Sequence, residues 1–236
     1  MKDDKLKPWM RILLIVCGLA LVAVLFVPLW RIDLDAPQYP EGLWLLIYPN
    51  KLAGNVDIIN GLNHYIGMKT LHTEDFIEFT LLPYIISFFA LFFVVAGVAA
   101  RRKLLYILFI LFVSFGILAM YDFFFFFYDY GHNLNPDAAI IVPGMAYQPP
   151  LIGFKQLLNF GAYSFPDIGG WIFISVGAVL LFLVVLVWRS AKKGKTKFAN
   201  AVMAFSLLTL ITSCNTGPEP LKTGVDNCYF CKMTIS

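Results

Sequence analysis

The sequence FTLLPYIISFFALFFVVAGVAARRKLLYILFILFVSFGILAMY, residues 79–121, decides the class of this protein. It contains two uncharged apolar runs, Phe79–Ala100 and Leu104–Tyr121, separated by three successive cations at residues 101–103. A helix needs about 20 predominantly apolar residues to cross the hydrocarbon core of a bilayer. Each run therefore predicts one transmembrane helix.

The composition of the whole chain agrees with a membrane protein. It is 59% hydrophobic and only 14% charged over 236 residues, whereas soluble domains are about 25% charged. Two further apolar runs, Ile12–Trp30 and Ile168–Trp188, have the length of a membrane span. We therefore predict an all-α membrane protein in which residues 1–190 form four transmembrane helices with two external loops, residues 31–78 and 131–170.

The distribution of cations predicts the orientation. Twelve of the 18 Lys and Arg residues lie before the first run, at residues 101–103, or at residues 189–197. By the positive-inside rule these segments are cytoplasmic, so both loops and the C-terminal tail are external. We expect a bacterial inner-membrane protein with a periplasmic tail. Topology accounts for the cations, so the lipid bilayer is a predicted partner and nucleic acid is not.

The aromatic residues after the third run predict an interface. Five consecutive phenylalanines, Phe123–Phe127, follow the apolar run and precede Tyr128 and Tyr130. Aromatic side chains are enriched where a membrane helix meets water. We expect this run to form an aromatic belt at the external surface of the bilayer.

Residues 191–213 have the order of an export signal inside the chain. Four lysines are followed by the apolar segment Phe198–Leu210 and by the short run Ile-Thr-Ser-Cys, which ends at Cys214. Basic, apolar and small residues in this order are typical of a signal peptide. The ending looks like a lipobox, which predicts lipidation of Cys214 and release of the tail as a lipoprotein. A fifth transmembrane helix is the alternative interpretation of the same segment.

The external tail contains a cluster of sulfur ligands at Cys228, Cys231 and Met233, in the spacing C-x-x-C-x-M. Thiolate and thioether sulfur select Cu(I) over hard cations. In an extended chain the side chains of Cys231 and Met233 project to the same face and can share one ion, with Cys228 assisting. Alternatively, the two cysteines form the redox pair of a membrane thiol-disulfide oxidoreductase.

Residues 214–236 also resemble the start of NosL-like copper chaperone lipoproteins, which assist assembly of nitrous oxide reductase. The resemblance rests on the lipobox cysteine, on a tether with prolines and glycines at residues 217–224, on Asp226, and on the C-x-x-C-x-M-x-I pattern ending at Ile235. It implies that Cys231 and Met233 bind Cu(I) and that nitrous oxide reductase is the recipient. The family's folded body is absent, so we expect this tail to be the truncated beginning of such a domain.

The first external loop supplies a second set of candidate copper ligands. They are spaced i, i+4 and i+8, so a continuous helix would place them along one stripe: His64, Met68 and His72. Imidazole and thioether groups together suit a Cu(I) relay or docking site. Gly67 weakens a helix and can end it before the stripe is complete, in which case these residues are structural.

The second external loop contains five prolines and is expected to be irregular, with at most a short helix at residues 154–160. Its copper-compatible residues, His132 and Met145, can complete a site with the first loop if the two loops pack together. The sequence has no phosphate-binding glycine loop, no Ser-His-Asp order and no H-E-x-x-H, so we predict no enzyme. The leading hypothesis is Cu(I) handling outside the membrane, and the alternative of another class is a scaffold or assembly partner without a metal.

Overall fold

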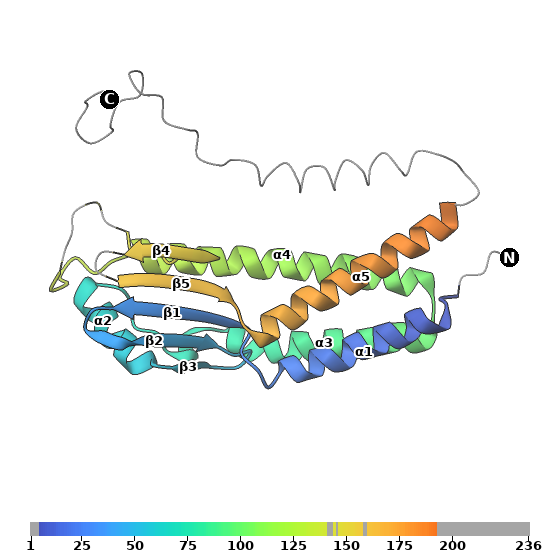
Figure 1. The fold of residues 1–236 in the computed structure, drawn as a ribbon, viewed down its shortest axis with the longest axis horizontal. Coiled ribbons are helices and arrows are strands. Elements are labelled where there is room, and N and C mark those ends of the chain that lie inside the picture. The colour runs from blue at the N-terminus through green and yellow to red at the C-terminus, as the bar shows by residue number, and fades with distance from the viewer. Residues whose placement is uncertain (1–4, 141–143, 145, 158–159, 193–236) are drawn as a thin grey trace, which may run out of the picture. The chain divides into compact units, whose positions relative to one another are not determined.

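The computed structural model describes residues 5–140, 144, 146–157 and 160–192. Residues 1–187 form one compact unit and residues 188–236 a second, and the architecture below is that of the first unit. The elements follow one another in this order: α1 (Pro8–Val24), β1 (Trp30–Ala36), β2 (Tyr39–Ile47), β3 (Leu52–Gly54), α2 (Val56–Ile66), the 3-10 helix η1 (Thr73–Asp75), α3 (Glu78–Ala99), α4 (Arg102–His132), β4 (Gly153–Leu157), β5 (Phe160–Pro166) and α5 (Ile168–Lys192) (Figure 1).

Three helices in the described part of the chain are long and apolar enough to cross a membrane: α3, α4 and, over Ile168–Ser190, α5. The protein is therefore membrane-associated. The first of the four predicted spans, Ile12–Trp30, is not among these three helices, because α1 has 17 residues and ends at Val24 instead of continuing to Trp30. Pro28 follows, and Trp30 already belongs to β1, so the last part of that apolar run enters a strand.

The apolar helices share one core. α1 and α3 approach closely at Gly18 and Gly97, where a Cβ atom on either glycine would lie 2.8–2.9 Å from a backbone oxygen of the other helix. Small residues allow such close backbone approach between helices in a membrane. On the other side, Phe112 of α4 and Phe173 of α5 stack with ring centroids 5.7 Å apart. Leu14, Phe93, Leu108 and Leu180, one from each helix, are buried in this core.

The prediction of an all-α fold is wrong, because the two external loops pair into a five-stranded antiparallel sheet with the strand order β3-β2-β1-β5-β4. The first loop supplies β1, β2 and β3, and the second supplies β4 and β5. At most a short helix was expected at residues 154–160, but residues 154–157 lie in β4 and residue 160 begins β5. The central pairing joins Ile32 of β1 to Ser164 of β5, residues that are far apart in the chain.

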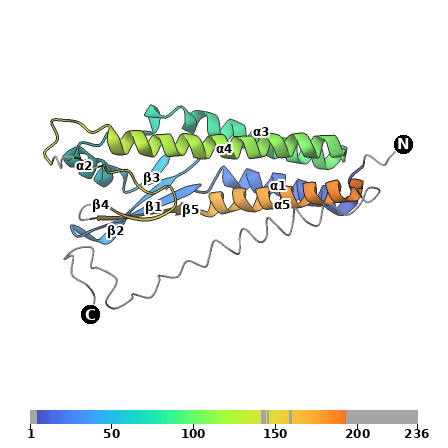
Figure 2. The same ribbon diagram turned by 90° about the horizontal axis from the view of Figure 1, so that it is seen from above.

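The alternation of side chains explains how this sheet is packed. β1 reads Trp-Arg-Ile-Asp-Leu-Asp-Ala, in which Ile32 and Leu34 point to one face and Arg31 and Asp33 to the other. The apolar face packs on α2 and on the end of α4, as Figure 2 shows. On the opposite face the cross-strand neighbours of Asp33, which are Trp44 and Tyr163, are exposed.

α4 links the membrane helices to the sheet. Its 31 residues measure about 46 Å at 1.5 Å per residue, whereas the hydrocarbon core is about 30 Å thick. The last turns therefore extend beyond the bilayer, where Phe127 and Tyr130 are buried in one cluster with Ile32, Leu45 and other residues of the sheet and α2. Phe124 and Phe125 are exposed, so only part of the predicted aromatic belt faces outward.

This packing predicts unequal roles for neighbouring phenylalanines. Phe127→Ala should lower the free energy of unfolding of the sheet domain, formed by the five strands, α2 and the end of α4, by about 3–5 kcal/mol, because a buried phenyl ring is lost and a cavity remains. Phe125→Ala, the matched control, should change it by less than about 1 kcal/mol, because that ring is exposed. Denaturation followed by tryptophan fluorescence in detergent measures both values. Equal losses would show that Phe127 is not a core residue.

Candidate functional site

The first candidate ligands lie around the C-terminal end of α2. The helix ends at Ile66, and Gly67 adopts a left-handed conformation with φ of 80°. The amide of Gly67 donates to the carbonyl of His64 (3.4 Å), and the amide of Met68 donates to the carbonyl of Asn63 (2.8 Å). These two hydrogen bonds define a Schellman motif, which turns the chain away from the helix axis.

Two asparagines fix the segment that follows this turn. Asn60 makes a two-point contact with the backbone of Leu71: its Nδ2 donates to the carbonyl (3.0 Å), and its Oδ1 accepts from the amide (2.7 Å). Asn63 is buried, and its Nδ2 donates to the carbonyl of Lys69 (3.3 Å). The polar residues of α2 therefore anchor residues 67–72 onto the helix, and their role is structural.

The structure does not place His64, Met68 and His72 on one helical stripe, because the helix ends between the first two. His64 is exposed on α2, next to the edge of the Tyr65 ring. Met68 is partly buried in the cluster under the sheet. His72 is exposed and extended at the start of η1. The condition that made the stripe a metal site, a continuous helix, is not met.

Of the two candidate ligands in the second loop, the structure describes His132. His132 lies in the last turn of α4 and stacks on Tyr128 with ring centroids 4.0 Å apart. Its Nδ1 lies 2.9 Å from the carbonyl of Tyr128, and because a carbonyl can only accept, that nitrogen carries the hydrogen. The Nε2 atom is then left as the acceptor or ligand atom of an exposed imidazole. Met145 lies outside the described residues.

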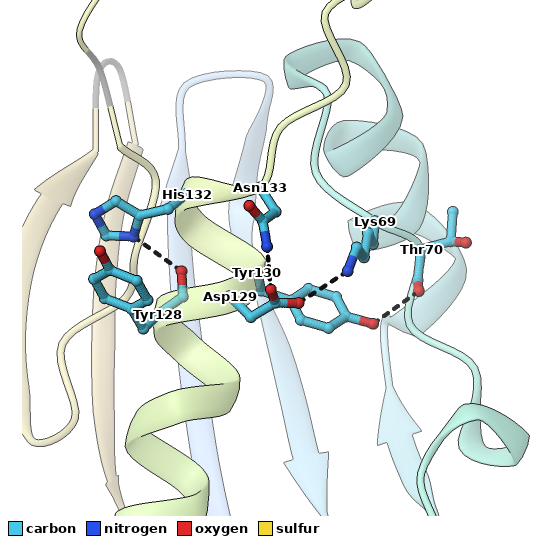
Figure 3. A network of polar contacts seen from close by, with 7 residues as sticks. All are labelled: Lys69, Thr70, Tyr128, Asp129, Tyr130, His132 and Asn133. Atoms are coloured by element: carbon cyan, nitrogen blue, oxygen red, sulfur yellow. Dashed lines mark hydrogen bonds and ion pairs between the residues drawn. The ribbon is translucent and has the colours of Figure 1, made fainter.

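A polar network joins the end of α4 to the segment of the first loop that follows α2 (Figure 3). Asp129 accepts from the ammonium of Lys69 (2.9 Å) and from the side-chain amide of Asn133. These hydrogen bonds lower the pKa of Asp129. The Tyr130 hydroxyl donates to the carbonyl of Thr70 (3.1 Å).

Burial, followed by the nearby carboxylates of Asp75 and Asp129, raises the pKa of Tyr130 to about 12. Tyr130 therefore remains a neutral donor at physiological pH. The network orders the segment after Gly67 and contributes to the placement of His64 and His72.

Among the residues that the structure describes, no three His, Cys, Asp or Glu side chains lie close enough together to hold a metal ion. The single free cysteine of this part, Cys17, is buried in α1 among the apolar helices. The predicted tail ligands Cys228, Cys231 and Met233, and the predicted lipidation site Cys214, lie outside the described residues. The chemistry expected of the tail therefore rests on its sequence.

Sequence reasoning missed a cavity beneath the sheet. It has a volume of about 80 Å³ and lies between β1, β2, α2 and the end of α4. Met68 and Asn63 line it, together with Tyr147 from the second loop. The alternation of Ile32 and Leu34 with charged residues was the signal in β1 that could have predicted a sheet with an apolar inner face.

Comparison with protein-family models, with curated proteins and with solved structures finds no match to this chain.

The two-point contact of Asn60 leads to a test of its structural role. Asn60→Ala should destabilise the sheet domain by about 1–3 kcal/mol, because the partly buried amide and carbonyl of Leu71 lose their partners. Hydrogen exchange at the Leu71 amide should accelerate correspondingly. Asn50→Ala is the control, since Asn50 is exposed at the turn before β3. Unchanged exchange at Leu71 would contradict this role.

Proposed function

We propose that this protein handles Cu(I) on the outer side of a bacterial inner membrane, for maturation of a copper enzyme. The observation that carries the proposal is the C-x-x-C-x-M cluster of the tail, Cys228, Cys231 and Met233. Soft sulfur ligands of this kind prefer Cu(I) to hard cations. The resemblance of the tail to NosL-like copper chaperones supports nitrous oxide reductase as the recipient.

The ends of the helices support the orientation that this function needs. At one end, Lys5 of the leader forms an isolated β-bridge with Arg101, and the Arg11 Nε donates to the carbonyl of Gly97 (3.1 Å). Cations of the leader and of the α3–α4 turn are therefore close together. The opposite ends of the same helices lead into the sheet. With the basic end in the cytoplasm, the sheet lies outside.

In this proposal the tail is the binding element and the loop histidines are secondary contacts. Cys231 provides a thiolate, Met233 a thioether, and Cys228 a second thiolate to a two- or three-coordinate ion. His64 and His72 are exposed, so each can contact Cu(I) or a partner's ligand during transfer. Met68 is partly buried and is the least accessible of the three. Cys214 serves as the lipid anchor of the tail.

The redox state of the tail distinguishes this function from thiol-disulfide exchange. In an oxidising compartment Cys228 and Cys231 can form a disulfide, whereas Cu(I) binding requires both thiols to be reduced. A copper-handling protein should therefore lose copper when the pair is oxidised. An oxidoreductase should instead cycle between the two states without requiring Met233.

The orientation can be tested with single cysteines in a chain whose four native cysteines are replaced by serine. Asp137→Cys in the second loop should react with a membrane-impermeant maleimide added to intact cells, because this exposed residue lies on the sheet side. Lys103→Cys should react only after the membrane is permeabilised. The reverse pattern of labelling would overturn the proposed topology.

The copper site can be tested by anaerobic titration of the full reduced chain against a chromophoric Cu(I) competitor. Cys231→Ser and Met233→Leu should each weaken Cu(I) binding about tenfold or more, equivalent to about 1.4 kcal/mol, with a smaller effect for Cys228→Ser. Cys17→Ser is the matched thiol control and should bind as the wild type does, because Cys17 is buried in α1. If Met233→Leu has no effect and the two cysteines are equivalent, the tail is an ordinary dithiol.

A double variant distinguishes the role of the tail in copper handling from that of the first loop. The double variant His64→Ala, His72→Ala should keep the tail's Cu(I) affinity, because neither imidazole belongs to the tail. It should instead slow copper transfer to the recipient enzyme. Wild-type transfer by this variant would leave the two histidines without a role in copper handling.

A further inference from the structure

The cavity beneath the sheet lies in the centre of the sheet domain. Its walls include Ile32 and Leu45 from the sheet, Ile59 from α2, and Phe127 from α4. Each of these side chains is buried in the apolar cluster. The cavity is therefore a largely apolar pocket of about 80 Å³, lined by β1, β2, β5, α2, α4 and segments of both loops.

Tyr147 brings a hydroxyl into this apolar surrounding. The amide of Tyr147 donates to the carbonyl of Gly131 (3.0 Å), and a Cβ atom at Gly131 would clash with the backbone of Gln148, so the two segments are closely apposed. The tyrosine side chain is only 1% exposed. Its hydroxyl has no hydrogen-bond partner among the described residues. An unpaired buried hydroxyl is destabilising, and most buried polar groups have a partner.

Water is a poor match for this pocket. A buried water molecule typically makes about three hydrogen bonds to protein groups. The polar side chains that line the cavity are those of Tyr147, Asn63 and Tyr130. The Nδ2 of Asn63 already donates to the carbonyl of Lys69, and the Tyr130 hydroxyl already donates to the carbonyl of Thr70. A cluster of waters would leave most of its hydrogen bonds unmade against the apolar walls. A molecule with an apolar body would leave no hydrogen bonds unmade at those apolar walls.

We propose that this cavity is a binding site for a small uncharged molecule that has an apolar body and one hydrogen-bonding group, which pairs with the Tyr147 hydroxyl. The volume limits the size of the ligand, because an engineered cavity of about 150 Å³ holds benzene and this one is about half as large. The matching class is therefore a molecule of a few non-hydrogen atoms, such as a short-chain alcohol. This site is independent of the copper chemistry proposed for the tail.

Ethanol and xenon test the two parts of the proposal, using the full chain in detergent. The reporter is the 13C-labelled methyl group of Met68, which lines the cavity and can be assigned among the seven methionines with Met68→Leu. Both probes should shift this resonance saturably in the wild type. Tyr147→Phe should weaken ethanol binding about two- to tenfold, the loss of one neutral hydrogen bond, and should leave xenon binding within about twofold.

Two further variants make the test specific. Tyr163→Phe removes a hydroxyl from the exposed face of the sheet and should leave both probes unaffected. Ala36→Leu adds volume at a buried wall position of β1 and should abolish the shifts with both probes. The proposal is overturned if ethanol gives no saturable shift in the wild type, if Tyr147→Phe binds it equally well, or if Ala36→Leu still responds.

Discussion

The packing of the last turns of α4 against the inner face of the sheet is the contact on which the sheet domain depends. Without it, much of the apolar face of the sheet would be exposed to water, because only α2 would still cover it. Phe127 and Tyr130 project from a helix that continues without a break from the apolar core. Because a helix is stiff along its axis, this continuity fixes the sheet relative to the membrane helices of the same compact unit.

The membrane helices were predictable because their signal is local and long. Phe79–Ala100 and Ile168–Trp188 are uninterrupted apolar runs, and the structure has helices over them. The sheet was not predicted because its strands are short and its central pair joins β1 to β5 across the whole membrane hairpin of α3 and α4. No window of sequence contains both partners, and the prolines of the second loop suggested irregular chain instead. Pro149 and Pro150 precede β4, and Pro166 is the last residue of β5, where it pairs with Trp30.

The candidate site shows the same division between local and non-local information. The spacing of His64, Met68 and His72 describes a stripe only while the helix continues, and the left-handed conformation of Gly67 ends it. Gly67 was recognised as a possible helix end in the sequence. The sequence could not predict which residues the side chains after that turn contact. Met68, for example, packs on residues of the sheet that are distant in the chain. The same applies to the cavity, whose walls come from elements that are distant in the chain.

A copper site needs two properties, and none of the three candidate ligands of the first loop has both. A soft ligand must be accessible to the ion, and it must have a second ligand within reach. His64 and His72 are accessible but have no acidic, thiol or imidazole cluster around them in the described part of the chain. Met68 is enclosed by apolar side chains, where a bare cation would lose its hydration without gaining ligands. Under the proposed copper function, binding would therefore come from the closely spaced sulfur atoms of Cys228, Cys231 and Met233.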